Sequence, residues 1–494
     1  MAKEKRAPRL ALRRHPHLYQ INAWAWLDEL AARHGRPVDL GRVPDAEWDA
    51  LRARGFDLVW LMGVWRRSAG ARQQARCAVA AFEGYDRALP GWTLDDVVGS
   101  PYAVADYQPE PRLGGWRELD RARHELNRRG MGLVLDLVPN HTALDHPWVG
   151  AHPDYFIQGD LAEYRQHPDA YFLVEGDGRA RLVAHGRDPY FAPWADSAQL
   201  NHFNPAARAA LLELVRGLAR HCDGLRCDMA MLLLNDIFPR TWSHRLAGWR
   251  APATEFWPDA IAAAPGLIWI AEVYWGLEAR LQQLGFDFTY DKDLLDLLRR
   301  QSASEIRRHL QSGGGDPARA VRFLENHDED RSASAFAPDK LPAALLLGST
   351  LPGLRFFQHG QLTGSRRKLP IQLARAAAEE PDPELVARYA QLLGLIDQPI
   401  FHDGDWRLLE ARSAGDPSYQ QLVAYRWSAG DEVRIVVVNW GDAAAHGLLA
   451  FDGAVGIGAV TLVDLLTGAK LDKAEAQLRL DLAPWQSLVL RPVR

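Results

Sequence analysis

Cysteine is scarce in this chain of 494 residues, which has three: Cys77, Cys222 and Cys227. Three scattered cysteines are too few for a disulfide framework or a cysteine-based zinc site. The sequence also lacks any run of about 18 apolar residues, which excludes a membrane-spanning helix. No apolar stretch suited to a signal peptide follows the basic N-terminus. We therefore expect a cytoplasmic protein.

No charge of one sign dominates the sequence. Lys and Arg number 58 against 63 Asp and Glu, a net charge of −5, and the two signs are interspersed. No basic patch indicates a nucleic-acid partner, and no charge run indicates a membrane surface. Apolar residues make up 47% and charged residues 24%, which is typical of a globular protein. The length suits one large domain with one or two smaller ones.

Eight short apolar segments have the length of buried β-strands, and amphipathic helical patterns such as Trp116–Arg129 and Ala206–Arg220 lie between them. Strands that alternate with helices predict a parallel sheet, and eight repeats predict a closed α/β barrel, the (β/α)₈ TIM barrel. The predicted strands are His17–Asn22, Asp57–Met62, Gly132–Val138, Gly224–Asp228, Leu267–Glu272, Phe286–Tyr290, Ala320–Glu325 and Leu354–Gln358.

Two stretches do not follow this alternation. The connection between the third and fourth predicted strands is far longer than usual, and its first part is rich in His, Asp, Tyr, Pro and Gly. It predicts an inserted domain, domain B, at residues 142–200. Strands divided by turns predict a C-terminal antiparallel β-sandwich, domain C, at residues 401–494. The barrel, domain A, is then expected in two parts, residues 1–141 and 201–400.

Carboxylates follow several of the predicted strands. Four segments each place one at or just beyond an apolar run: Asp136–His141, Gly224–Asp228, Trp269–Glu272 and Phe323–Asp328. The C-terminal ends of barrel strands meet at one mouth, so these side chains should converge there. Two cooperating carboxyl groups are what cleavage of a glycosidic bond requires. The arrangement predicts an enzyme that acts on sugars.

Three acidic residues are the candidate catalytic groups. Arg226 and Asp228 share one face of a strand, and a guanidinium favours the ionised carboxylate that a nucleophile needs. Glu272 follows an apolar run whose burial should raise its pKa, as a general acid requires. Asp328 is suited to binding ring hydroxyls and stabilising positive charge. The alternatives are structural: a buried ion pair, a surface glutamate and a helix cap.

Neutral polar residues accompany these acids in the same segments. His141 and His327 suit hydrogen bonding to sugar hydroxyls, although a lone histidine is more often an ordinary core residue. Asp136 and Asn140 frame the loop after the third strand, and holding that loop is an equally good interpretation of both.

The four segments resemble the four signature regions of the α-amylase superfamily, glycoside hydrolase family thirteen. Gly99–Tyr107 resembles its loop after the second strand, and Leu351–Gly360 resembles its eighth strand. The match suggests a bacterial-type member with a short domain B. The resemblance implies a retaining mechanism, with Asp228 as nucleophile, Glu272 as acid/base and Asp328 as transition-state stabiliser. The residues that would line the cleavage subsite are Tyr102, His141, Arg226 and His327.

Two departures from the family pattern concern the acceptor side and the metal. Many starch-degrading members carry a Lys-His pair that shapes the acceptor side where this chain has Met231 and Leu232. The insertion is short and lacks a carboxylate cluster for calcium, although Asn140 matches one calcium-supporting position. We therefore expect no metal and no other cofactor, and a structural calcium is not favoured.

Tryptophan is abundant, at 18 residues. Flat aromatic rings stack on sugar faces, so tryptophans near strand ends are candidates for ligand contact, with a core position as an equal alternative. These are Trp24, Trp26, Trp65, Trp92 and Trp275.

The sequence thus predicts a retaining hydrolase of α-glucosidic bonds, with maltooligosaccharides or related α-glucans as substrates. The alternative is a transglycosylase or glucosyl isomerase of the glucanotransferase or trehalose-forming type, because water and a sugar hydroxyl compete for the same intermediate. A non-catalytic barrel is a third hypothesis, and the presence of Asp228, Glu272 and Asp328 argues against it. Linkage, chain length and oligomeric state are left open.

Overall fold

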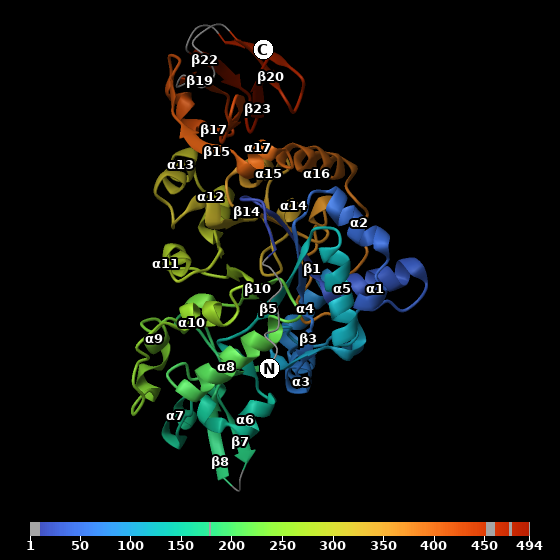
Figure 1. The fold of residues 1–494 in the computed structure, drawn as a ribbon, viewed down its shortest axis with the longest axis vertical. Helices are drawn as coiled ribbons and strands as arrows, with labels where there is room; N and C mark the ends of the chain where they lie inside the picture. The colour runs from blue at the N-terminus through green and yellow to red at the C-terminus, as the bar shows by residue number, and fades with distance from the viewer. Residues whose placement is uncertain (1–9, 177–178, 451–459, 474–476, 494) are drawn as a thin grey trace, which may run out of the picture.

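Eight parallel strands form a closed barrel in the computed structural model, which describes residues 10–176, 179–450, 460–473 and 477–493 (Figure 1). The order around the barrel is β1-β14-β13-β12-β11-β10-β5-β2. The predicted TIM barrel is confirmed. Its strands are β1 His17–Asn22, β2 Leu58–Met62, β5 Gly132–Leu137, β10 Gly224–Cys227, β11 Ile268–Ala271, β12 Phe288–Tyr290, β13 Ala320–Arg322 and β14 Leu354–Gln358.

At the mouth of the barrel, three strands end before the end of the segment that was predicted as a strand. β10 ends one residue before Asp228, β11 ends one residue before Glu272, and β13 ends at Arg322, well before Asp328. Every residue of β2, β5, β10 and β11 is buried, because helices cover the outside of the barrel and side chains fill its interior.

Helices surround the barrel, and their sequences explain where they begin. In α8, Asn204 caps the helix by accepting from Ala206 N, and Pro205 occupies the first turn, where no backbone donor is needed. In α5, Leu119, Ala122 and Leu126 form the buried face. The main barrel helices are α1 Ala23–His34, α2 Asp45–Ala53, α5 Trp116–Asn127, α8 Pro205–Leu218, α10 Phe256–Ala263, α11 Glu278–Gln283, α12 Lys292–Arg300, α13 Ala303–Ser312, α15 Leu341–Thr350, α16 Pro383–Ile396 and α17 Pro399–Asp403.

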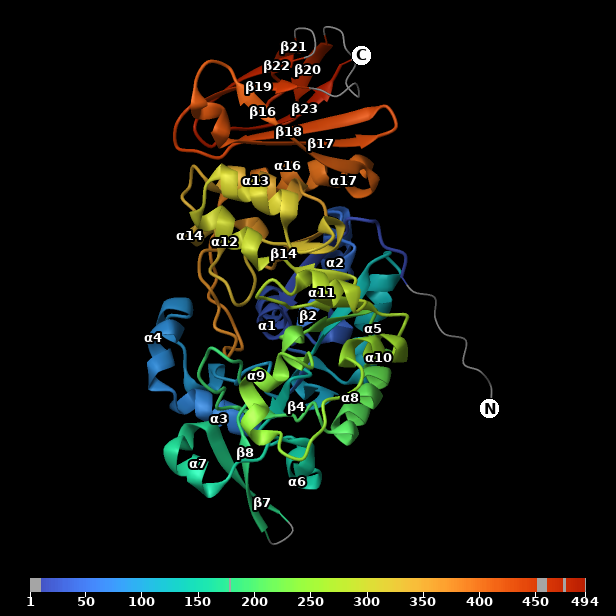
Figure 2. The ribbon, with the colours of Figure 1, turned by 90° about the vertical axis from the view of Figure 1, so that its left-hand side faces the viewer.

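The long connection between β5 and β10 projects from one end of the molecule (Figure 2). It contains two antiparallel pairs, β6 with β9 and β7 with β8, and two short helices. Its small core includes Ile157, Tyr171 and Leu182, together with Phe238 and Trp242 from a helix that comes after β10. The projecting unit therefore draws on residues beyond position 200. Its elements are β6 His141–Ala143, α6 Pro147–Ala151, α7 Leu161–Gln166, β7 Tyr171–Gly176, β8 Arg179–Ala184 and β9 Ser197–Gln199, and the later helix is α9 Phe238–Trp242.

Two antiparallel sheets come after α17 at the opposite end of the molecule (Figures 1 and 2). One has the order β15-β17-β18-β23-β20-β21 and the other β16-β19-β22. The predicted C-terminal antiparallel sheet is thus present. Its strands are β15 Asp405–Leu409, β16 Ala411–Ser413, β17 Leu422–Ala429, β18 Glu432–Asn439, β19 Ala445–Ala450, β20 Val460–Asp464, β21 Lys470–Lys473, β22 Gln477–Leu482 and β23 Ser487–Pro492.

Strand β17 joins these sheets to the barrel because alternate side chains point to opposite faces. Leu422 and Ala424 pack into the core between the two sheets, whereas Tyr425 and Trp427 pack against the barrel core. Trp427 Nε1 donates to the carbonyl oxygen of Thr350, at the end of α15, at 2.8 Å. No helix in the described part of the chain is long and apolar enough to cross a bilayer.

Candidate active site

Arg226 lies at the centre of the polar cluster inside the barrel mouth. Its side chain is 1% exposed, and Nη1 donates to Asp228 Oδ1 at 2.7 Å. Nη2 forms an ion pair with Glu272 Oε2 at 2.9 Å. The neighbouring strands β10 and β11 deliver these groups: Glu272 N donates to the carbonyl oxygen of Cys227 at 3.0 Å, one step beyond the paired strands. One guanidinium therefore holds two carboxylates from adjacent strands.

Glu272 is held at both carboxylate oxygens. The backbone N–H of Met229 donates to Oε2 at 2.7 Å, and the hydroxyl of Tyr274 donates to Oε1 at 2.7 Å. Met229 has a φ of 44°, in the left-handed region that side chains rarely adopt, and this conformation aims its N–H at the carboxylate. The orientation of Glu272 is therefore set before any ligand binds.

Burial changes the proton affinity of these acids. It raises the pKa of Glu272 to about 7, against the opposing charge of Arg226. It also raises the pKa of Asp228, and the charge and hydrogen bond of Arg226 oppose this rise. The rise in the pKa of Glu272 agrees with the expectation from the apolar run that precedes it. For Asp228, the guanidinium offsets only part of the cost of burying the charge.

Asp328 lies in the loop after β13 and has a different environment. Its backbone N–H donates to Asn326 Oδ1 at 2.8 Å, which shapes the loop. Its carboxylate Oδ2 lies 3.0 Å from His327 Nε2, and 43% of its side chain is exposed. Desolvation by neighbouring groups acts to raise the pKa of Asp328. The charges of His327, Arg226 and Lys368 outweigh this effect and lower the pKa to about 2. Asp328 is therefore an ionised, accessible carboxylate at neutral pH.

His327 connects Asp328 to the barrel interior. Gln20, on β1, donates to His327 Nδ1 at 2.7 Å, so the ring proton lies on Nε2. That proton faces Asp328 and the hydroxyl of Tyr102, whose oxygen is 2.6 Å from Nε2. The Tyr102 and His327 rings are stacked, with centroids 5.3 Å apart. Three aromatic rings also lie within 6 Å of the Arg226 guanidinium: Trp60 at 5.2 Å, Tyr102 at 5.4 Å and Tyr290 at 5.6 Å.

His141, the first residue of β6, lies close to Tyr102 at the mouth. Burial lowers its pKa to about 4, although the charges of Asp196 and Glu272 act in the opposite direction, so the ring is neutral at pH 7. Its ring centroid lies 5.0 Å from that of Trp194. The structure therefore brings all seven residues named from the sequence to one end of the barrel.

Asp136 and Asn140 support this end of the barrel from within. Asp136 accepts from Trp60 Nε1 at 3.1 Å and from the backbone N–H of Gly63 at 3.3 Å, and burial raises its pKa to about 6. Asn140 Oδ1 accepts from Gln199 Nε2 at 3.1 Å, and the same Gln199 nitrogen reaches the Asn140 carbonyl oxygen at 2.9 Å. Gln199 therefore holds both the side chain and the backbone of Asn140 in place.

Three of the tryptophans named from the sequence are structural. Trp24, Trp26 and Trp65 are buried in the main core. Trp92 is half-buried, and its Nε1 donates to Asp86 at 2.7 Å. Trp275 is half-buried in the loop after β11, three residues beyond Glu272, and its ring centroid lies 5.1 Å from that of the exposed Tyr190. Of the five, Trp275 therefore stays a candidate for ligand contact.

Several residues of the cluster were not predicted from the sequence, and two of them orient candidate catalytic side chains. Tyr274 holds Glu272, and Gln20 fixes the tautomer of His327. Gln20 lies between the apolar residues Tyr19 and Ile21 of β1, and a buried amide is a signal of an internal partner. Tyr274 carried no comparable signal, because a tyrosine after a strand is common in any barrel.

The fold and the cluster define a TIM-barrel protein with an acidic mouth, and comparisons with known proteins agree. No protein-family model matches the chain. Alpha-amylase 3 of Dictyoglomus thermophilum is 25% identical over 300 residues, 56% of each chain. The trehalose-6-phosphate hydrolase of Escherichia coli is 27% identical over 298 residues, 52% of this chain and 54% of the enzyme. The chain spans about half the length of the curated relatives it matches.

Solved structures extend the likeness in fold to nearly the whole chain. A maltogenic α-amylase from Thermotoga neapolitana superposes with a TM-score of 0.70 at 19% identity, covering 97% of this chain and 99% of that protein. At this identity the match concerns the fold. The chain is therefore similar to α-amylase-type enzymes in sequence over about half of its length and in fold over nearly all of it.

Proposed function

We propose that this protein is a retaining glycoside hydrolase that cleaves α-glucosidic bonds of maltooligosaccharides or related α-glucans. The observation that carries the proposal is the single guanidinium of Arg226, which holds Asp228 at 2.7 Å and Glu272 at 2.9 Å. A retaining mechanism needs two carboxyl groups close together, one ionised and one able to donate a proton.

In the first step, Asp228 attacks the anomeric carbon and Glu272 donates a proton to the leaving oxygen. The carbon–oxygen bond breaks, the leaving sugar departs as an alcohol, and a glycosyl ester forms on Asp228. Arg226 donates its hydrogen bond to Asp228 and so favours the ionised nucleophile. The raised pKa of Glu272, about 7, leaves much of it protonated near neutral pH.

In the second step, the ionised Glu272 takes a proton from water, and the water oxygen displaces Asp228 from the anomeric carbon. Two inversions restore the original configuration, and Glu272 regains its proton. Asp328, ionised and accessible, stabilises the positive charge that develops on the sugar ring in both steps. Tyr102, His141 and His327 bind the ring and its hydroxyls.

The decisive experiment has two readouts. Proton NMR during cleavage of an α-linked aryl maltoside should show the α-anomer as the first product, and a β-anomer would disprove the retaining mechanism. A fluorinated glucosyl donor that slows the second step should leave a covalent adduct on Asp228, found by mass spectrometry of peptides. The Asp228→Asn variant is the control and should carry no adduct.

A second candidate function is glycosyl transfer with the same residues. Met231 and Leu232 are both buried and replace the polar Lys-His pair of many starch-degrading members, so the acceptor side lacks those donors. Chromatography of the products from maltotriose distinguishes the two functions. Glucose and maltose alone support hydrolysis, whereas longer or rearranged products support transfer.

The division of the chain belongs to the same proposal: a barrel in two parts, a domain B at 142–200 and a domain C from 401. The separate core between the C-terminal sheets supports domain C, whereas the core of the projecting unit extends beyond residue 200 to Phe238 and Trp242. Limited proteolysis followed by mass spectrometry should find the first cuts near these boundaries. We also propose a cytoplasmic location, which fractionation of the source cells would test.

A further inference from the structure

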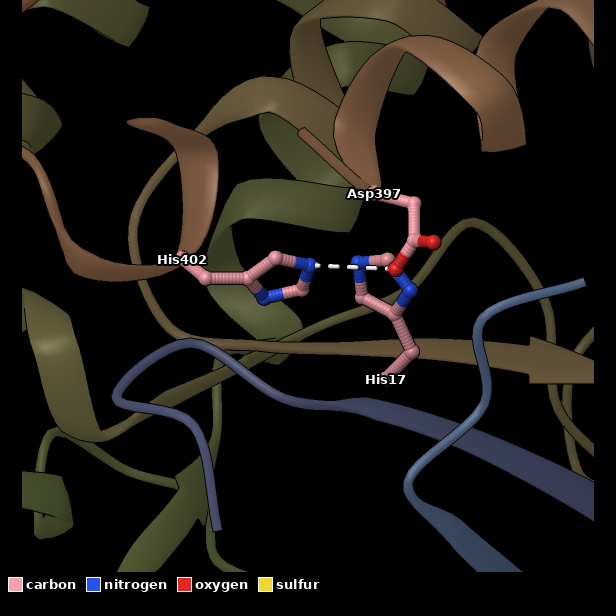
Figure 3. Close-up of side chains that lie close together, drawn as sticks. All are labelled: His17, Asp397 and His402. Atoms are coloured by element: carbon pink, nitrogen blue, oxygen red, sulfur yellow. Dashed lines mark ion pairs between the residues drawn. The ribbon is translucent and has the colours of Figure 1, made fainter. Parts of the chain in front are cut away.

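Two histidines and an aspartate face one another at the end of the barrel opposite the carboxylate cluster (Figure 3). His17 is the first residue of β1, whereas Gln20 of the same strand reaches His327 at the mouth. Asp397 comes directly after α16, and His402 lies in α17. The three residues therefore connect the first barrel strand to the segment that leads into the C-terminal sheets.

The spacing of the three side chains suits one small ion. Each offers a ligand atom, and these atoms all lie within 4.8 Å of one another. His402 Nε2 and Asp397 Oδ1 are 3.5 Å apart, and the two imidazole centroids are 4.7 Å apart. Two ligands that each lie about 2.1 Å from a tetrahedral zinc ion are separated by about 3.4 Å. The His402–Asp397 pair already has that spacing.

The protonation pattern of His402 leaves a lone pair directed into this cluster. Its Nδ1 donates to the carbonyl oxygen of His15 at 2.6 Å, so Nε2 of the neutral ring carries no proton. His402 Nε2 is buried and has no hydrogen-bond partner among the residues that the structure describes, and the same holds for His17 Nδ1. The two side chains are 1% and 0% exposed. An unprotonated nitrogen that faces a carboxylate oxygen is repulsive unless a cation lies between them.

We propose that His17, Asp397 and His402 bind a divalent transition-metal ion of the zinc class. Two imidazole nitrogens and one carboxylate oxygen form a ligand set that zinc accepts, with water as a fourth ligand. The carbonyl oxygen of His15 orients His402, as hydrogen-bond acceptors commonly orient metal-binding histidines. Asp397 is 43% exposed and provides the route from solvent. The site is separate from the carboxylate cluster, and its role is to fasten β1 to α16 and α17.

Two arginines compete with such an ion. Arg13 Nη1 lies 2.5 Å from Asp397 Oδ1, and Arg355 Nη1 lies 3.3 Å from His17 Nε2. Arg13 also pairs with Asp57 at 2.8 Å. The charges of Arg13 and Arg355 are therefore formally balanced by those of Asp57 and Asp397. A bound metal would take Asp397 Oδ1 from Arg13, which keeps its pair with Asp57, and would displace Arg355 from His17 Nε2. In the competing interpretation, Arg13 is itself the cation of the cluster and no metal binds.

Cobalt and zinc titrations separate these two interpretations. The protein should carry no affinity tag and should carry Cys77→Ser, because Cys77 is an exposed thiol. After chelator treatment and dialysis, one equivalent of Co²⁺ should produce the intense visible absorption of a four-coordinate ion, and one equivalent of Zn²⁺ should abolish it. Zn²⁺ should also raise Tm until one equivalent is bound. A spectrum that stays that of aqueous Co²⁺, with no rise in Tm, would overturn the proposal.

Variants locate the effect. His402→Gln and Asp397→Asn should each lose the absorption and the Zn²⁺-dependent rise in Tm. Asp397 is partly exposed, so Asp397→Asn keeps the test valid if the buried His402→Gln variant fails to fold. His446→Gln is the matched control, because His446 forms a surface pair with Asp481 at 2.6 Å, and it should behave like the parent. Retention of both effects in Asp397→Asn would place the metal elsewhere and disprove this site.

Discussion

The two ends of the barrel use opposite charge arrangements. At the mouth, one buried guanidinium, that of Arg226, serves two buried carboxylates, and a third, Asp328, lies at the rim. At the other end, Arg13 and Arg355 lie beside two buried imidazoles, and Arg13 pairs with the buried Asp57 and the exposed Asp397. The mouth is therefore a site of excess buried acid, and the opposite end is a site of buried nitrogen lone pairs.

This difference explains the chemistry that each end is able to support. Buried acids that share one cation have raised proton affinities, which suits proton transfer near neutral pH. A buried neutral imidazole keeps one nitrogen lone pair free, which suits the binding of a metal ion. If the mouth supports proton transfer, substitutions there that remove one acid or one hydrogen-bond donor should change turnover or its pH dependence.

Asp228→Asn should cause the largest loss, because an amide does not form the glycosyl ester. We expect turnover to fall on the order of 10⁴-fold or more, with Tm unchanged or higher. Steady-state kinetics on a maltooligosaccharide measures it. Asp95→Asn changes an acid whose side chain is fully exposed, and it should retain normal turnover. Near-normal activity in Asp228→Asn would remove this residue from the mechanism.

Glu272→Gln should cause a smaller loss that depends on the leaving group. We expect turnover to fall about 10²- to 10⁴-fold on maltooligosaccharides, because no proton reaches the leaving oxygen. An activated aryl glycoside needs no such proton, so its glycosylation step should be nearly normal. Pre-steady-state measurement of aryl release tests this contrast. Equal losses on both substrates would count against Glu272 as the acid.

Tyr274→Phe should reduce turnover about tenfold, because it removes one hydrogen bond that orients Glu272. A donor to a carboxylate favours the ionised form, so its loss should raise the pKa of Glu272 further. The basic limb of the pH–activity profile should then move to higher pH. Tyr190→Phe removes the hydroxyl of an exposed tyrosine, and its profile should match the parent. If the basic limb of the profile does not move in Tyr274→Phe, the hydrogen bond from Tyr274 has no influence on the pKa of Glu272.

The smallest expected effect is on stability as a function of pH. The folded protein raises the pKa of Glu272 from 4.5 to about 7. The contribution of this group to stability is therefore fully present below pH 4.5 and is lost as pH rises through 7. Glu272→Gln has no such dependence, so its Tm relative to the parent should be higher at about pH 8 than at about pH 5. Thermal melts at both pH values measure it. A difference in Tm that does not change with pH would contradict the raised pKa.

The fold was more predictable than the details of the mouth. The apolar runs predicted all eight barrel strands, because strands covered on both faces have few polar residues. They did not predict where the strands end: β13 stops at Arg322 although its apolar run continues to Leu324. Backbone pairing with the neighbouring strands decides that point. The short helices of the projecting unit were missed, since its sequence has little helical period.

The candidate site was predictable in its residues but not in its contacts. Four strand-end segments named the acids and the arginine. The roles of these residues remain predictions until the variants are measured. The hydrogen bond from the Met229 backbone to Glu272 depends on a left-handed conformation that the sequence does not reveal. The Tyr274 and Gln20 contacts depend on which side chains the closed barrel places against one another.

The sequence by itself determined the order of strands and helices and the kinds of groups that stand at the strand ends, because periodicity and residue chemistry are local properties. Only the tertiary structure decided which groups meet. One arginine serves Asp228 and Glu272, Asp328 stays at the rim, and His17 approaches two residues nearly 400 positions away. Proximity of this kind arises when the barrel closes, and burial then sets the proton affinities of the groups that it encloses.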